Sequence, residues 1–108
     1  MWNKPSKKLL ARVPDLYSTE KIKTADKTIY LHFFICGSDW YIAEISHDDF
    51  DYMFGYSILN GDFEMAEWGY ISLSELCKIN VMGIQVDRDM HWEPTIFKKI
   101  PNVKLYEE

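Results

Sequence analysis

The most regular pattern in the chain is a run of β-branched and aromatic residues at 28–36, which repeats in character at 39–45. Gly37 and Ser38 separate the two runs, so together they predict a β-hairpin with a tight glycine turn. Both alternate sets of positions in the first run are apolar or aromatic. A strand with two such faces is typical of the middle of a sheet, with other segments packed on each side.

Further runs predict the rest of the sheet. Residues 51–59 and 67–71 have the composition of strands, and the turn sequence Asn60-Gly61-Asp62 lies between them. Residues 84–86 predict a last short strand. The order of these strands favours an antiparallel meander.

Three short segments predict helices. Prolines bracket the apolar positions of residues 5–14, a capping box begins the segment 72–79, and residues 94–100 predict a final helical turn. The polar residues 18–27 predict a surface loop. We therefore expect an α+β fold, in which an antiparallel sheet of about four to five strands, with a central hairpin, carries two or three short helices.

The composition is that of a folded domain. The 108 residues are 47% hydrophobic and 16% aromatic against 27% charged, so we expect one domain that spans residues 1–108. No stretch approaches the length of a membrane span, and residues 1–8 lack the apolar core of a signal peptide, which predicts a cytoplasmic protein without membrane contact. Cys36 and Cys77 predict buried, reduced thiols, and no spacing predicts a metal site or a cofactor.

The charges are segregated along the chain. Residues 1–27 carry seven basic and three acidic side chains, whereas residues 28–77 carry nine acidic side chains and no Lys or Arg. This pattern disfavours nucleic acid as a direct partner, because phosphate binding depends on clustered basic residues. It favours a partner protein with a basic surface, although a merely solvated acidic face explains it equally well.

Motifs along nearly the whole chain, from Trp2 to about Lys99, form a set that is specific as a whole. They are Leu16-Tyr17 with Thr19-Glu20, Tyr30-Leu31-His32-Phe33-Phe34, Asp39-Trp40-Tyr41 with Ala43-Glu44, Phe54-Gly55, the run from Ala66 to Leu76, and Val86-Asp87-Arg88-Asp89 with His91-Trp92 and Pro94. In this set the chain resembles the bacterial domain of unknown function 2958 family. The resemblance implies a bacterial cytoplasmic protein of the kind often carried on phages, plasmids and conjugative elements, and it implies no activity.

The segment 87–93 holds the densest group of chemically active side chains. It places Asp87, Asp89 and His91 within a few residues of Arg88. Side chains of these types are the ones that acid–base catalysis or metal binding uses. Ion-pair networks with a purely structural role contain the same residue types, and this structural interpretation of the segment is favoured. We expect Asp87, Arg88 and His91 to converge with Glu44 or Glu67 near one end of the sheet.

Glu44 is the other candidate carboxylate. A three-residue loop at 37–39 places it opposite His32 on the hairpin, whereas a two-residue loop places the two residues on opposite faces. A lone carboxylate in a buried strand costs several kcal/mol, so Glu44 must be at an edge, solvated or paired. A partnered, structural Glu44 is favoured over a catalytic one.

Three classes of function stay open. The first is a small acidic protein that covers a basic surface of a partner, with an inhibitory or anti-defence role. The second is a hydrolase or transferase that uses Glu44, Asp87, Asp89 and His91, although common catalytic motifs are absent from the sequence. The third is a small-ligand module lined by Trp40, Tyr41, Trp68, Tyr70 and Trp92, residues that are more often core.

For the first class, two acidic loops are expected at the same end of the sheet. Such a patch would steer a basic partner toward it, without cofactor or metal. The residues expected to bind the partner are Asp48, Asp49, Asp51, Asp62, Glu64, Glu67, Arg88 and Trp92.

Overall fold

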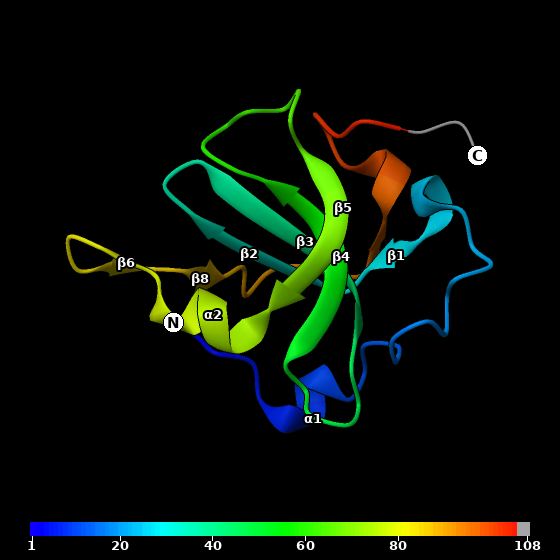
Figure 1. Cartoon of the computed structure of the whole chain (residues 1–108), viewed down its shortest axis with the longest axis horizontal. Coiled ribbons are helices and arrows are strands. Elements are labelled where there is room, and N and C mark those ends of the chain that lie inside the picture. Colours follow the sequence, from blue (N-terminus) through cyan, green and yellow to red (C-terminus); the bar gives the residue numbers. More distant parts are fainter. Residues whose placement is uncertain (106–108) are drawn as a thin grey trace.

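A five-stranded antiparallel sheet forms the body of the computed structural model, which describes residues 1–105 (Figure 1). Its strands lie in the order β5-β4-β3-β2-β8, so β3 is central and β5 and β8 are the two edges. The consecutive strands β2 to β5 form the expected meander. Their bounds are β2 Leu31–Ile35, β3 Ser38–Ile45, β4 Tyr52–Ile58, β5 Glu67–Ser72 and β8 Asp87–Arg88.

The other elements are short. Two small antiparallel pairs flank the sheet, β1 with β9 and β6 with β7. The α+β expectation is confirmed in its sheet, whereas the helices are a minor part of the fold. The bounds are α1 Lys7–Leu10, the 3-10 turn η1 Thr24–Asp26, β1 Thr28–Ile29, α2 Leu73–Lys78, β6 Asn80–Val81, β7 Ile84–Gln85, β9 Thr95–Ile96 and the 3-10 turn η2 Phe97–Lys99.

The β2–β3 hairpin turns one residue earlier than expected. Ile35 pairs with Ser38, which leaves Cys36 and Gly37 as a two-residue loop. Both loop residues have positive φ, 44° and 86°, the conformation whose twist suits a two-residue hairpin. Cys36 is therefore exposed in the turn, and the expectation that it is a buried thiol is wrong.

A bulge in β3 lies where β4 approaches most closely. The pairing of β3 with β4 shifts between Ile42 and Glu44. A Cβ atom at Gly55 would stand 2.3 Å from the Tyr41 carbonyl oxygen, so only glycine fits there. The bulge adds one residue to β3, so that Ile42 and Ile45 both face the same core.

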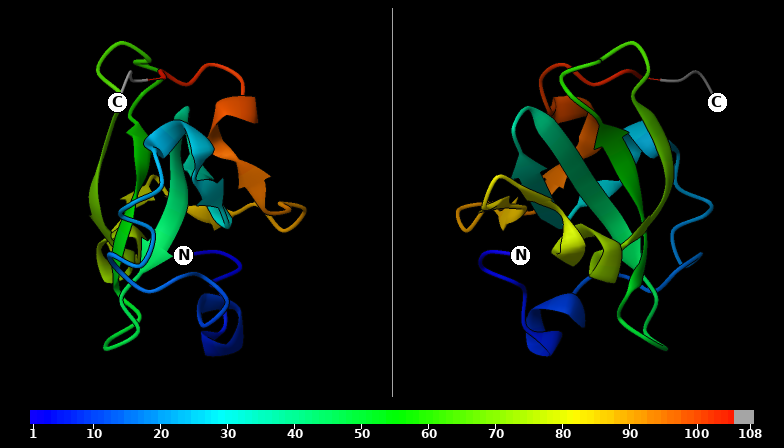
Figure 2. Two further views of the ribbon diagram at one scale, coloured as in Figure 1. Left: turned by 90° about the vertical axis from the view of Figure 1, so that its right-hand side faces the viewer. Right: turned by 60° about the vertical axis from the view of Figure 1, so that its left-hand side comes forward.

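Each face of the sheet carries its own hydrophobic core. Residues from α1 and α2 pack on one face against Phe33, Ile42 and Met53, and Ser72 caps α2 through the amide of Glu75, as the capping box predicts. On the other face the C-terminal segment with η2 covers Tyr56 and neighbouring side chains. The two layers are visible on either side of the strands in Figure 2. Within residues 1–105, no helix has the length and apolar character to cross a membrane.

Candidate functional site

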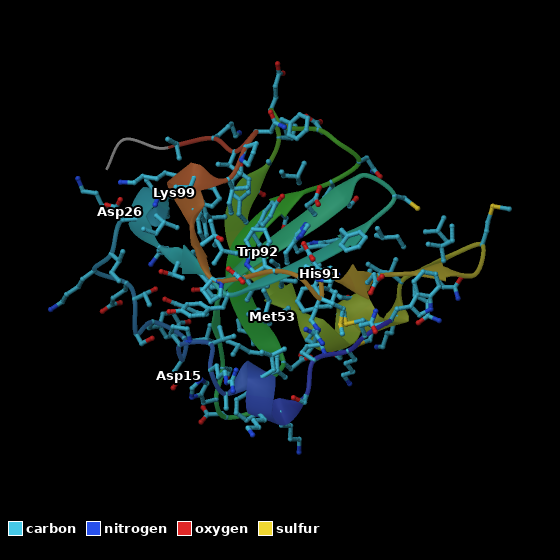
Figure 3. The ribbon with its side chains drawn as sticks, turned by 180° about the vertical axis from the view of Figure 1, so that it is seen from behind. Asp15, Asp26, Met53, His91, Trp92 and Lys99 are labelled. Carbon is cyan, nitrogen blue, oxygen red and sulfur yellow. The ribbon has the colours of Figure 1, made fainter. Side chains whose placement is uncertain are left out.

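A cleft of about 520 Å³ lies where the short edge strand β8 pairs with β2. Phe34 pairs with Asp87 and Phe33 with Arg88, so the polar segment after α2 is fixed to the hairpin. His91 and Trp92 follow on the segment that crosses behind the sheet (Figure 3). The polar and charged side chains that line the cleft are those of Asn3, His32, Ser38, Asp39, Asp87, Arg88, Asp89 and His91.

His32 is held between two carboxylates. Its Nε2 atom lies 2.7 Å from Asp39 Oδ1, and its Nδ1 atom lies 3.3 Å from Asp89 Oδ2. A carboxylate oxygen only accepts, so a neutral imidazole donates to one of the two carboxylates and an imidazolium donates to both. Either way, neither ring nitrogen of His32 is left for a ligand. His32 thus holds the side chains of Asp39 and Asp89 at the cleft.

Aromatic rings fix the imidazole in this position. The ring of Tyr41 stacks on that of His32 at 4.6 Å with an interplanar angle of 8°, and the Trp92 ring lies 5.3 Å away. Trp92 donates its Nε1–H to the Ile29 carbonyl at 3.0 Å, which anchors it to the fold. Burial, with Asp39 and Asp89 nearby, raises the pKa of Tyr41 to about 12.

The N-terminus closes one side of the cleft. Trp2 bridges to Asp87, and Asn3 donates from Nδ2 to Asp87 Oδ1 at 2.9 Å. Arg88 donates from Nε to the Asn3 carbonyl at 2.8 Å. Arg88 therefore ties the N-terminus to the sheet edge while it lines the cleft.

The cleft can accept hydrogen bonds. Within the part of the chain that the structure describes, Asp39 Oδ2 and Asp87 Oδ2 receive no hydrogen bond, whereas Asp89 Oδ1 accepts from the His91 amide at 3.0 Å. The Asp39 and Asp89 side chains are 28% and 32% exposed, so solvent and ligands reach them. Three carboxylates and one guanidinium line the cleft, an arrangement suited to a positively charged group. In residues 1–105, no group of three or more His, Cys, Asp or Glu side chains is placed to hold a metal ion.

Four of the predicted site residues converge in this cleft, namely Asp87, Arg88, Asp89 and His91. The expected convergence with Glu44 or Glu67 is wrong, because Glu44 is bound by loop 15–27 and Glu67 lies on β5, at the edge of the sheet opposite to β8. Sequence reasoning missed Asp39 as a site residue. The sequence feature that could have indicated Asp39 is the Cys36-Gly37 turn. This turn sets the register in which Asp39 lies opposite Phe34, in the strand that carries His32.

Glu44 belongs to a separate, buried cluster. Its carboxylate accepts from the amides of Tyr17 at 2.9 Å and Thr19 at 3.1 Å, and also from the Thr19 hydroxyl. Lys27 Nζ lies 4.0 Å from Glu44 Oε2 and donates to the Thr19 carbonyl at 2.5 Å. Glu44 is 3% exposed, so it is a paired structural carboxylate that ties loop 15–27 to the central strand.

The two acidic loops lie at opposite ends of the sheet, which corrects the expectation of one patch. The loop with Asp48, Asp49 and Asp51 precedes β4, and the loop with Asp62 and Glu64 follows it. Figure 1 shows these loops at the bottom and the top of the view. Successive connections of a meander must alternate between the two ends of the sheet, so the loops cannot meet.

Several of these carboxylates are used by the fold. Asp51 accepts from the Ser74 amide at 2.6 Å and from the Ser72 hydroxyl at 2.9 Å, at the start of α2. Asp49 accepts from two amides of its own loop, and Asp62 accepts from the Met65 amide. Lys4 and Lys7 line the same surface hollow as Asp49 and Asp51. The charge blocks of the sequence are therefore intermixed in space.

The predicted aromatic groove is not formed by the five candidate residues. Trp40 is buried in one core, Tyr41 in the other, Trp68 and Trp92 are half-buried, and Tyr70 is exposed. They belong to different faces of the sheet, so they do not line one cavity.

The fold and the cleft define a small, mainly antiparallel β protein with an acidic cleft at one sheet edge. A comparison with protein families then identifies the family of the chain. The chain belongs to the family described as protein of unknown function (DUF2958), whose model matches residues 7–102. No match was found among the curated proteins or among the solved structures.

Proposed function

We propose that the protein binds a partner protein by taking a basic side chain of that partner into the acidic cleft. One observation carries the proposal: Asp39, Asp87 and Asp89 converge on one cavity, and oxygens of Asp39 and Asp87 have no donor from residues 1–105. Partly exposed carboxylates with unused oxygens are acceptors for a ligand. A guanidinium group suits them best, because its planar fork of donors matches carboxylates in pairs.

A partner of this kind agrees with the acidic net charge of −5. The negative field would speed the encounter with a basic surface, and the cleft would then fix one side chain of that surface. If the partner's basic surface otherwise holds nucleic acid, occupation by this protein inhibits by competition. Such competition would give the protein the inhibitory or anti-defence role. Carriage on mobile elements, which the family resemblance implies, remains a separate prediction.

The test is a nuclear magnetic resonance titration with the blocked tripeptide Gly-Arg-Gly. Citrulline in place of arginine supplies a neutral control of nearly the same shape. We expect amide shifts at Asp39, Asp87 and Asp89 with the arginine peptide, and none with the citrulline peptide. Equal responses to both peptides, or shifts confined to other parts of the chain, would contradict the proposal.

An enzyme is the second candidate, and it rests on His91. The imidazole of His91 is exposed in the cleft and makes no hydrogen bond with residues 1–105, unlike that of His32. A hydrolase or transferase would use His91 as the proton carrier beside Asp87 and Asp89. In that case His91→Ala abolishes activity with an unchanged melting temperature, whereas the arginine tripeptide still binds.

A further inference from the structure

Strand β5 leaves one side of its backbone unpaired. It is an edge of the five-stranded sheet and pairs only with β4 among the described strands. Figure 2 shows it at the border of the sheet. Natural edge strands are usually protected by lysines, prolines, bulges or covering segments, because a free edge pairs with other chains. Glu67 is the only charged residue of β5, and the strand contains no proline.

The register fixes which groups face outward. The Leu73 amide donates to the Asp51 carbonyl at 2.9 Å, which continues the β4–β5 ladder beyond its last pair. Hydrogen-bonded pairs alternate with non-bonded pairs in an antiparallel ladder. Ile71, Gly69 and Glu67 therefore bond to β4, while the backbone groups of Trp68 and Tyr70 point away from the sheet.

A groove of about 580 Å³ is lined by residues of β5, of its partner β4 and of the loop that joins the two strands. Gly69 forms part of its floor, and a Cβ atom built there meets no atom within 4 Å. The packing of the described chain therefore does not require glycine at this position. A glycine inside a strand often marks the close approach of another backbone or a ligand. The apolar side chains of Leu59 and Met65 line the groove and are 53% and 75% exposed.

The negative charge of the groove favours a basic ligand. Asp62 and Glu67 are its only charged lining residues within the described chain, and both are acidic. Lys104 donates from Nζ to the Glu64 carbonyl at 2.5 Å, and neither residue lines the groove. An acidic groove beside a free strand edge is complementary to an extended segment that carries lysine or arginine.

We propose that β5 is a second interaction site, at which an extended basic segment of another protein adds a strand to the sheet. The segment would bond to the outward backbone groups of Trp68 and Tyr70. One of its basic side chains would lie over Gly69 and approach Asp62 and Glu67, and its apolar side chains would contact Leu59 or Met65. This site shares no lining residue with the cleft of His32 and does not depend on it.

The probe is a fluorescent short peptide of alternating valine and lysine, titrated with the whole chain and followed by anisotropy. Two matched peptides test the two parts of the proposal: one replaces every lysine by glutamate, and one has methylated backbone nitrogens. We expect binding of the lysine peptide alone, and weaker binding at higher salt. Equal binding of the glutamate or the methylated peptide would overturn the proposal.

Two variants locate the site. Gly69→Val places a side chain in the groove, where its Cβ atom meets no other atom within 4 Å, and we expect it to abolish binding while the melting temperature is retained. Asp62→Asn with Glu67→Gln should weaken binding about tenfold, and it keeps the proposal testable if the first variant does not fold. The control with the same change of charge is Asp48→Asn with Glu75→Gln, at exposed residues away from the groove.

Further outcomes decide between occupants. The cleft variant Asp39→Asn with Asp87→Asn should bind the lysine peptide as well as the wild type does, which separates this site from the cleft. Light scattering should show a monomer. A wild-type dimer that Gly69→Val converts to monomers would overturn the proposal, because β5 would then pair with a second copy. Unchanged peptide binding by Gly69→Val would also overturn it.

Discussion

Asp39 and Glu44 lie near opposite ends of the same strand, β3, and their surroundings differ completely. The Glu44 carboxylate receives three hydrogen bonds from loop 15–27 and has buried Lys27 beside it. Within residues 1–105, Asp39 has one side-chain hydrogen-bond contact, with His32, and it lines the cleft. The Glu44 side chain is 4% exposed and that of Asp39 is 28% exposed. A carboxylate that the chain itself satisfies maintains the fold, whereas one with an unused oxygen is available to a ligand.

The largest effect should come from Glu44. Glu44→Ala leaves the Lys27 ammonium buried without its counter-charge and removes an acceptor from two amides. We expect the free energy of unfolding in urea to fall by about 3–5 kcal/mol. Glu44→Gln retains an acceptor oxygen and should lose less. A loss below about 1 kcal/mol for the alanine variant would break the comparison, because Glu44 would then not be needed by the fold.

Asp51 provides an intermediate case, a surface carboxylate that the fold uses. Asp51→Asn should cost about 1–2 kcal/mol at neutral pH, because a charged acceptor at the start of α2 is lost. Asp48→Asn is the matched control, since Asp48 is exposed and its carboxylate accepts no hydrogen bond within residues 1–105. Equal losses for the two variants would contradict the role of Asp51.

The pH dependence of the Asp51 effect has a definite sign. Partial burial raises the pKa of Asp51, but hydrogen bonds from Ser74 and Ser72 outweigh it and leave the pKa below its usual 3.8. The contribution of the carboxylate is therefore present above pH 3.8 and is lost as the pH falls below it. The difference in unfolding free energy between wild type and Asp51→Asn should shrink in acid, as urea unfolding across that range would show.

Tyr41 reports on the cleft itself. Its pKa is raised to about 12, so the native state keeps its proton when the unfolded chain, with a usual value of 10.0, has lost it. The native state binds more protons between these values, and the free energy of unfolding must therefore fall as the pH rises from 10 to 12. Tyr41→Phe should show a shallower fall over this range. Identical slopes would contradict the raised pKa of Tyr41, which burial causes first and the charges of Asp39 and Asp89 second.

The sequence predicts the sheet well, for clear physical reasons. The strands of the meander are marked by β-branched and aromatic runs, and the capping box at Ser72 begins α2 as expected. Such local signals survive because each one depends on a few neighbouring residues. The position of the hairpin turn was predicted wrongly by one residue, since Cys36 is an unusual choice at positive φ.

The candidate site was predicted only in part, because it depends on register and on distant contacts. The segment 87–91 was identified by its composition alone. Its partners His32 and Asp39 could be placed only with the correct hairpin register, in which a shift of one residue exchanges the two faces. Asn3 joins the cleft through contacts with Asp87 and Arg88, which are more than eighty residues away in sequence, and no local pattern indicates such a contact.

The most direct test of the account is a paired measurement on the variant Asp39→Asn with Asp87→Asn. If these carboxylates serve a ligand, the free energy of unfolding should change by less than about 1 kcal/mol, while affinity for the arginine tripeptide falls about tenfold. The contrary result is a variant that loses about 3 kcal/mol or more of stability, as expected for Glu44→Ala, and binds the tripeptide like the wild type. The cleft would then be a structural network, and its carboxylates would belong to the fold.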